Sequence, residues 1–294
     1  MWIIISLVTV IVSCLIADWN RRHKQEIVAL NFWRSLVAII SLLPFCLFGT
    51  WPSETSFYLI SILIGLGSGI AAMTTFHLAA KFNGRISILH SAVAMLFTFA
   101  AWIIIDPSSR SLFIETPLKG SAICLLLISA GVSLFFMRNK STANLEKGYL
   151  LPTILIGMLS AILTIIGKLA LPSNISSDLN SKVIIMSIII FSVQALMSFA
   201  IIYYKKYQKQ SHTLHFKKHL KGRIIYLGLL GSVGCLTSWA AIALAPNPAY
   251  VKAIAMSAPI LLLGYHKILK IEDKANPIAG TILAVSVILL ILLQ

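Results

Sequence analysis

Long apolar runs separated by short polar breaks make up most of the chain. A helix needs about 20 apolar residues to cross the hydrocarbon core of a bilayer. Ten segments are candidates by this measure, the first being the shortest: 2–17, 27–49, 57–80, 86–105, 118–137, 149–171, 183–204, 224–244, 249–266 and 277–293. The first segment lacks a basic leader and a small-residue cleavage site, so we expect a retained helix and not a signal peptide. The pattern predicts an all-α polytopic membrane protein with ten transmembrane helices.

Two parts of the chain share one plan, in which an apolar run, a polar break and a second apolar run follow one another. The parts are Ile64–Ile105 and Leu227–Lys270, and a shift of 163 residues superimposes them without a gap. The shift aligns Gly65 with Gly228, Leu66 with Leu229, Thr74 with Thr237, Ala80 with Ala243 and Ala92 with Ala255. We therefore predict an internal duplication, with residues 1–145 and 146–294 as two five-helix repeats of one unit. Because each repeat crosses the membrane an odd number of times, the second enters from the opposite side and the repeats are inverted.

The composition agrees with a membrane protein. Hydrophobic residues make up 58% of the chain and charged residues only 11%, and the mean hydropathy is +0.91. Soluble domains carry roughly 25% charged residues. The net charge of +15 could suggest a nucleic-acid partner, but the basic residues lie in the loops between apolar runs, so none is expected. The four cysteines lie inside apolar runs without CxxC spacing, which is typical of small buried residues and not of disulfides or zinc ligands.

The distribution of basic residues predicts an orientation. Eighteen Lys and Arg residues fall in the loops on one face of the ten-helix arrangement, and three fall on the other, namely Arg110, Lys119 and Lys182. By the positive-inside rule, loops 1–2, 3–4, 5–6, 7–8 and 9–10 are cytoplasmic and both termini lie outside. We expect an integral protein of the bacterial inner membrane.

Several short motifs carry a family resemblance. They are the segment Ala79–Val132, its counterpart Ala240–Leu289 with Ala245-Pro246 and Ser257-Ala258-Pro259, and Phe32-Trp33-Arg34-Ser35-Leu36. In these features the chain resembles the ten-helix EamA-type members of the drug/metabolite transporter (DMT) superfamily. The resemblance implies two five-helix halves around a central cavity that is bounded by spans one, three, four, six, eight and nine. Two departures stand out: Asp106-Pro107 replaces the usual Gly-Glu after span four, and the family's termini are usually cytoplasmic.

Polar and ionisable residues inside the spans are the candidates for a substrate site, because such residues usually face a cavity or a transport path. On span nine, Lys252, Met256 and Pro259 share a helical face, and His90 lies on the equivalent span of the first repeat. The predicted substrate-binding residues are His90, Lys252, Trp239, Thr74, His77, Met256, Thr164 and Lys168. Pro259 has no N–H to donate, so we expect a kink there beside the site.

A structural role is the alternative for each of these residues. Lys252 and Lys168 lie near helix ends, from which their stems could reach the headgroups. His77 could be interfacial, and Trp239 could be core packing. We expect Arg34 to bond helix ends within the protein. In loop 7–8, His212, His215 and His219 could share a helical face, but the flanking lysines favour a solvated or lipid-facing loop over a metal site.

The combined features predict a secondary transporter that moves a small metabolite by alternating access. Basic, aromatic and hydroxyl residues without acids in the spans favour a solute with an anionic group, plausibly an amino acid. Coupling to protons could run through His90 or His77; exchange and facilitated diffusion are the alternatives. We see no motif for a nucleophile, a catalytic metal or a cofactor, so no enzyme is expected. The other functions left open are a lipid-handling flippase, a carrier subunit and an intramembrane enzyme, and the chain could be a monomer or a homodimer.

Overall fold

The computed structural model describes residues 1–23, 26–81, 88–137, 147–172, 176–207, 221–268 and 276–293, and every element in these ranges is helical. All ten predicted segments coincide with helices. The helices are α1 (Trp2–His23), α2 (Ile27–Leu47), α3 (Thr55–Lys81), α5 (His90–Ile105), α6 (Pro107–Glu115), α7 (Pro117–Phe136), the 3-10 turn η2 (Lys147–Tyr149), α8 (Leu150–Ala170), α9 (Ser177–Tyr207), α10 (Lys221–Leu244), α11 (Pro248–Ala255), α12 (Ala258–Ile268) and α13 (Pro277–Leu292).

Seven spans in the described residues are long and apolar enough to cross a membrane: α2, α3, α7, α8, α9, α10, and α11 taken with α12. The pair α5 and α6 passes the same test together but is bent by 97°. The apolar part of α1, Trp2–Ile16, and α13 are shorter. The prediction of an all-α polytopic membrane protein is confirmed, while the number of ten crossings stays a prediction.

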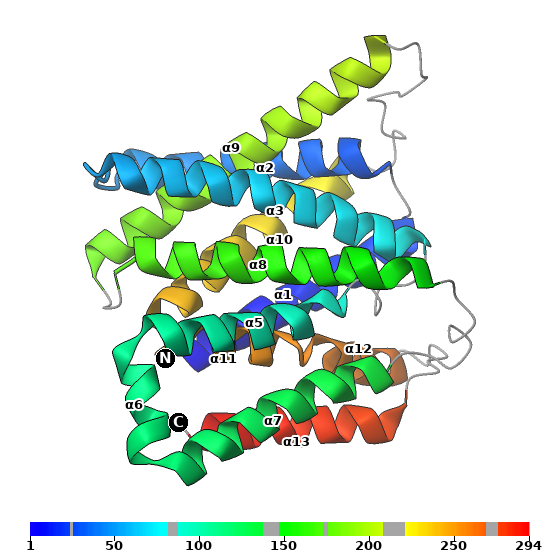
Figure 1. The fold of residues 1–294 in the computed structure, drawn as a ribbon. Helices are drawn as coiled ribbons and strands as arrows, with labels where there is room; N and C mark the ends of the chain where they lie inside the picture. Colours follow the sequence, from blue (N-terminus) through cyan, green and yellow to red (C-terminus); the bar gives the residue numbers. More distant parts are fainter. Residues whose placement is uncertain are drawn as a thin grey trace.

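The helices stack in layers, and their ends separate into two sides (Figure 1). Helices α2, α3 and α9 lie at the top of the view, α1, α8 and α10 below them, then α5 with α11 and α12, and α7 beside α13 at the bottom. Both chain termini and α6 lie at the left. The helix ends that lead into the loops predicted to be basic lie at the right. Most residues of those loops fall outside the described ranges, and their cytoplasmic location stays a prediction.

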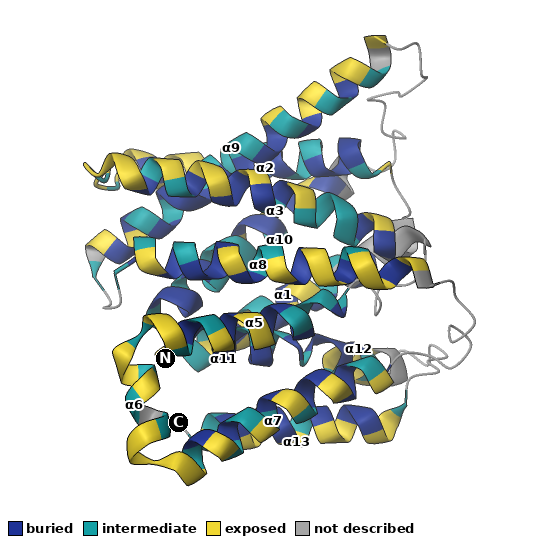
Figure 2. Ribbon diagram, in the orientation of Figure 1, coloured by how far each residue is buried: buried dark blue, intermediate teal, exposed yellow. Residues whose placement is uncertain are grey.

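Large apolar side chains occupy many exposed positions, as expected where a helix contacts lipid. Figure 2 shows exposed positions recurring along α3, α7 and α9, which lie at the outside of the stack. Exposed apolar residues on these three helices include Leu59, Leu63, Leu66, Leu118, Leu125, Phe136, Leu196 and Phe199.

Glycines bring two pairs of helices into close contact. A Cβ added at Gly65 of α3 would lie 2.8 Å from the Val193 Cβ of α9. A Cβ added at Gly228 of α10 would overlap the side chain of Val37 and lie 3.1 Å from the Arg34 carbonyl oxygen of α2. Neither position tolerates a side chain without movement of the neighbouring helix. Glycines thus permit close helix contact on both α3 and α10.

Helix α6 was not predicted from the sequence, which indicated only a polar turn after Ile105. The Oδ2 atom of Asp106 accepts hydrogen bonds from the Ser109 amide at 2.9 Å and from the hydroxyls of Ser108 and Ser109 at 2.6 Å each. Pro107 follows as the first helical residue, where its missing N–H removes no bond. Asp106 is thus an N-cap, and it starts a new helix at the bend.

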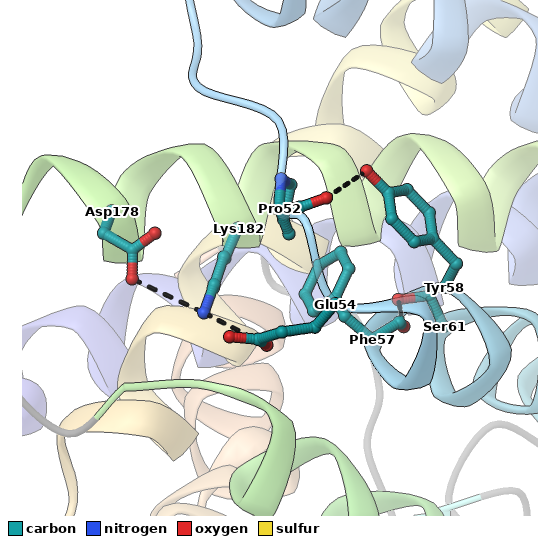
Figure 3. Close-up of polar contacts among 7 residues, drawn as sticks. All are labelled: Pro52, Glu54, Phe57, Tyr58, Ser61, Asp178 and Lys182. Atoms are coloured by element: carbon teal, nitrogen blue, oxygen red, sulfur yellow. Dashed lines mark hydrogen bonds and ion pairs between the residues drawn. The ribbon is translucent and has the colours of Figure 1, made fainter.

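At the end of the molecule that carries the termini, the α2–α3 connection contacts the start of α9 (Figure 3). Lys182 Nζ lies 3.5 Å from carboxylate oxygens of both Glu54 and Asp178. The amide of Thr50 donates to the Ser181 hydroxyl at 3.2 Å, and the Tyr58 hydroxyl donates to the Pro52 carbonyl at 2.7 Å. The Lys182–Glu54 ion pair and the Thr50–Ser181 hydrogen bond hold residues of the first half against the first turns of α9 in the second.

The glycine contacts predict a matched pair of destabilising substitutions. Gly65→Ala and Gly228→Ala should each lower the free energy of unfolding by roughly 1–3 kcal/mol, because the added methyl group overpacks the interface. Thermal melting of the purified protein in detergent measures this effect. Gly264→Ala is the control, since a Cβ at Gly264 has no neighbour within 4 Å. Equal melting temperatures for all three variants would contradict the close approach.

The Asp106 cap predicts a pH-dependent stability. Burial acts to raise the pKa of the Asp106 carboxyl, but hydrogen bonds from Ser108 and Ser109 outweigh it and hold the pKa below its ordinary value. A lowered folded-state pKa means that the stabilisation is present above the unfolded value, about 4, and disappears as the pH falls through the folded value. Asp106→Ala should therefore cost about 1 kcal/mol at pH 7, and its deficit against the unmodified protein should vanish at low pH. Unfolding of both proteins between pH 7 and pH 3 tests this, with Glu115→Ala at the other end of α6 as the control.

Candidate functional site

A cavity of about 330 Å³ lies between the two halves of the chain. Seven helices line it: α1, α2, α3 and α8 to α11. Its polar wall consists of Thr9, Ser13, Arg34, Ser68, Ser160, Thr164, Gln194, Ser238 and Lys252. Its apolar wall includes Ile64, Leu163, Ile190, Phe191, Trp239 and Ile242. The volume is at the lower end of the range for small-molecule sites, roughly 300–1,000 Å³.

Arg34 is held at the cavity wall by neutral groups. Its Nη2 atom donates to Asn31 Oδ1 and to Gln194 Oε1, both at 3.0 Å. The Gln194 amide in turn donates to the Ser68 hydroxyl at 2.9 Å. The guanidinium carbon lies 5.3 Å from the ring centroid of Phe76. Side chains from α2, α3 and α9 thus fix the position of the guanidinium without neutralising its charge.

Lys252 approaches the cavity from α11. This helix begins at Pro248 behind an Asn247 cap, whose side chain accepts from the Ala249 amide at 2.9 Å. Lys252 Nζ lies 3.3 Å from the Ser160 hydroxyl of α8. The side chain therefore bonds a neighbouring helix and lines the cavity, and does not extend to a membrane surface.

No carboxylate lies near either cation among the described residues. The ion pairs that the structure shows there join Lys182 to Glu54 and Asp178. The Nε–H of Arg34 is buried and has no acceptor among the described residues. The described part of the cavity wall contains two basic side chains and no acidic one.

The contacts of both cations lie at mid-depth of the bundle. Ser68 is the central residue of α3, and Ser160 is the central residue of α8. Gln194 lies close to the middle of α9. If these helices cross the bilayer, the site is near its midplane, where secondary transporters bind their substrates.

Three predicted substrate residues line the cavity, namely Lys252, Trp239 and Thr164. Gly167 makes room for Trp239, because a Cβ at this glycine would overlap the indole ring. The Thr164 hydroxyl donates to the Ser160 carbonyl at 2.6 Å.

The other five predicted residues are not among those that line the cavity. Thr74 is half-buried and its hydroxyl donates to the Ile70 carbonyl at 2.9 Å. His77 is exposed, and Met256 is fully buried in a core cluster. His90 begins α5 and packs against α8, where its carbonyl would lie 2.9 Å from a Cβ at Gly157.

Lys168 caps the C-terminal end of α10. Its buried Nζ donates to the carbonyl of Ala243 and, at 2.9 Å, to that of Ala245. These carbonyls end α10, where no further turn supplies N–H groups to donate to them and where the helix dipole favours a cation. The contact accounts for the buried amino group without a ligand.

Pro259 lies where the ninth predicted span is interrupted. Helix α11 ends at Ala255, the turn Met256–Ser257 follows, and α12 begins at Ala258. The Met256 amide bonds the carbonyls of Lys252 and Ala253 at 3.1 and 3.2 Å, which tightens the end of α11. The proline cannot donate a bond back to this turn, so the break has a local cause one turn after Lys252.

The sequence prediction of the cavity wall differs from the structure in three helices. Span four was expected to border the cavity, but α5 contributes no residue to its wall, whereas α2 and α9 do. Arg34 was expected to bond within the protein, and it does bond Asn31 and Gln194, but Arg34 and Gln194 also line the cavity. The signal was present in the sequence, because each is a strongly polar side chain inside an apolar run without an acidic partner.

The described residues hold no group of three or more His, Cys, Asp or Glu that could bind a metal ion. His212, His215 and His219 lie outside the described residues. A comparison of the chain with protein-family models finds no match, and a comparison with curated proteins finds no significant match. The DMT resemblance therefore stays a prediction.

The Lys168 contact predicts a loss of stability without a loss of binding. Lys168→Met removes two hydrogen bonds from a charged donor and leaves buried carbonyls unpaired, which should cost about 2 kcal/mol. Chemical unfolding of the purified protein measures this cost, with Lys119→Met at the start of α7 as the control. A weakened response to ligands in a variant of unchanged stability would instead place Lys168 in the binding site.

Proposed function

We propose that the chain is a secondary transporter, of the kind that the DMT resemblance implies, which binds a small metabolite with an anionic group in this cavity and exposes it alternately to the two sides of the membrane. One observation carries the proposal. Arg34 and Lys252, one from each half of the chain, contribute to one cavity in which the described wall has no carboxylate. Ionisable groups inside a membrane protein are costly and mark substrate or ion paths.

Two inverted repeats of five helices are part of the proposal, and the pairing of helices supports them. The proposed two-fold symmetry exchanges α1 with α8, α2 with α9, α3 with α10, α5 with α11 and α12, and α7 with α13. The contact of α1 with α10 then becomes that of α8 with α3, and the contact of α5 with α8 becomes that of α11 and α12 with α1. The contacts of α2 with α9, α5 with α11 and α7 with α13 map onto themselves. This pattern is expected of a two-fold axis between the halves.

The glycine contacts support the same exchange at the level of residues. Gly65 meets Ile190 and Val193 of α9, and Gly228 meets Arg34 and Val37 of α2. Gly65 and Gly228 are the pair that the 163-residue shift aligns. Their partners are also three residues apart in each case, so one contact occurs twice with the halves exchanged.

The weak contact between the halves at one end of the bundle fits a transporter that rocks about such an axis. Glu54 belongs to the first half and Lys182 to the second, and the Glu54 side chain is 60% exposed. An exposed ion pair stabilises by at most about 1 kcal/mol. The bond can therefore hold one end closed and still break within an ordinary transport cycle.

We propose exchange of solutes over proton coupling. His90 and His77 were the predicted proton carriers, and neither is among the residues that line the cavity. The described wall offers no histidine or carboxylate that could carry a proton with the substrate.

Transport by reconstituted protein tests the proposal. Proteoliposomes loaded with a mixture of small organic anions should take up labelled anions by exchange. Lys252→Met should lower the rate by about tenfold or more, because a hydrogen bond from a charged donor contributes roughly 1.5–3 kcal/mol. Arg34→Lys should lower it similarly, since it keeps the charge but loses the planar donor fork.

Lys205→Met is the matched control, because Lys205 lies near the end of α9 and not at the cavity. It should transport at the unmodified rate. If Lys252→Met and Arg34→Lys both transport normally while folded, this cavity is not the substrate site.

A further inference from the structure

The charges on the cavity wall restrict the kind of ligand that the cavity can bind. Arg34 bonds to the neutral side chains of Asn31 and Gln194, and Lys252 bonds to the neutral hydroxyl of Ser160. Each bond satisfies a donor without compensating the charge. Two positive charges in a site of low dielectric cost free energy through lost hydration and mutual repulsion.

The nearest acidic residue along the lining helices does not change this balance. Asp18 lies two residues beyond Ile16 on α1, but it is buried and is not among the residues that line the cavity. The other described carboxylates, Glu26, Glu54, Asp106, Glu115 and Asp178, lie at or beyond helix ends.

Resting on the proposed function, we infer that the substrate is a small organic dianion without an ammonium group, held between Arg34 and Lys252. A dianion neutralises both cations and leaves the occupied cavity without net charge. A zwitterionic amino acid brings no net charge, so both positive charges of the protein remain, and its ammonium meets a wall that is already cationic. A monoanion leaves one charge uncompensated. Amino acids, which the sequence favoured, are therefore the poorer ligands.

The other residues that line the cavity are suited to contact the oxygens and the carbon chain of such a dianion. The Ser238 hydroxyl can donate to an oxyanion oxygen, while Leu163 and Trp239 offer apolar and aromatic surface. The hydroxyls of Ser13 and Ser68 donate to the carbonyls of Thr9 and Gly65 and would have to exchange these acceptors for the ligand. The volume of about 330 Å³ admits a short dicarboxylate or a small phosphate monoester. Both present the same chemistry, oxyanion oxygens with two negative charges on a short carbon chain.

Ligand-induced thermal stabilisation of the purified full-length protein tests the inference. The decisive pair is glutarate and glutamate, which share a carbon skeleton and differ by the ammonium group. Glutarate or glycerol 3-phosphate should raise the melting temperature, and the stronger of the two identifies the dicarboxylate or the phosphate ester as the preferred source of the charge. Glutamate and alanine should need about tenfold or more higher concentration for the same shift.

A charge-reversing variant adds a positive test. Lys252→Glu should lose the response to the dianions and gain a relative preference for glutamate, because the cavity then holds a partner for the ammonium group. Lys252→Met should lose the dianion response without that gain. If either variant fails to fold, the comparison of ligands on the unmodified protein still decides the question.

Three outcomes separate this inference from the proposed function. Stabilisation by glutamate or alanine equal to that by the dianions overturns the inference and leaves a transporter of amino acids. A protein stabilised by neither dianion also overturns it. Dianion binding without exchange across proteoliposomes supports the inference and overturns the transporter.

Discussion

A charge inside a membrane protein must be held by the protein itself, because the bilayer core supplies neither water nor counter-ions. Arg34 shows how this chain meets that constraint. Asn31, Gln194 and Ser68 form a hydrogen-bonded chain from α2 through α9 to α3, with the Phe76 ring against the guanidinium. Such a chain requires three helices to approach closely. Gly65 permits the approach of α3 to α9, and Gly228 lets α10 pack against α2 beside Arg34, so the packing of the helices and the chemistry of the cavity depend on each other.

The cavity is asymmetric although the helix pairing is symmetric. The 163-residue shift that aligns Gly65 with Gly228 also aligns Leu89 with Lys252. Gly65 contacts Ile190 where Gly228 contacts Arg34, so Ile190 is the counterpart of Arg34. Each cation thus has an aliphatic counterpart in the other half. A packing contact that occurs in both halves needs similar residues in each half. A binding site close to the proposed two-fold axis is shared by the halves, so each polar group is needed only once. The proposed duplication is therefore compatible with a single pair of cations, one from each half.

Hydrophobic pattern alone located all ten helical segments, because runs of apolar residues leave the backbone in lipid no other way to satisfy its hydrogen bonds. It missed α6, whose nine residues have no long apolar run and whose start depends on the local cap at Asp106. The site was predicted in part. Lys252, Trp239 and Thr164 line the cavity, but Met256, on the same predicted face as Lys252, is in the core. The turn at Met256–Ser257 interrupts the helical spacing on which that face was based. Arg34 was missed because a sequence shows that a residue lies in a span but not which neighbour it faces.

The interactions in the bundle differ in strength in a way that matters for motion. The glycine contacts and the Lys168 cap are buried, and each would cost on the order of 1–3 kcal/mol to lose. The tie between Glu54 and Lys182 is partly exposed and contributes at most about 1 kcal/mol. A movement that separates the halves at this end therefore breaks weak bonds first and leaves the helix contacts intact. In the proposed transport cycle, two uncompensated cations would favour separation of the empty halves, and an anion bound between them would oppose it. Ligand charge and conformation are coupled in this way through the same two side chains.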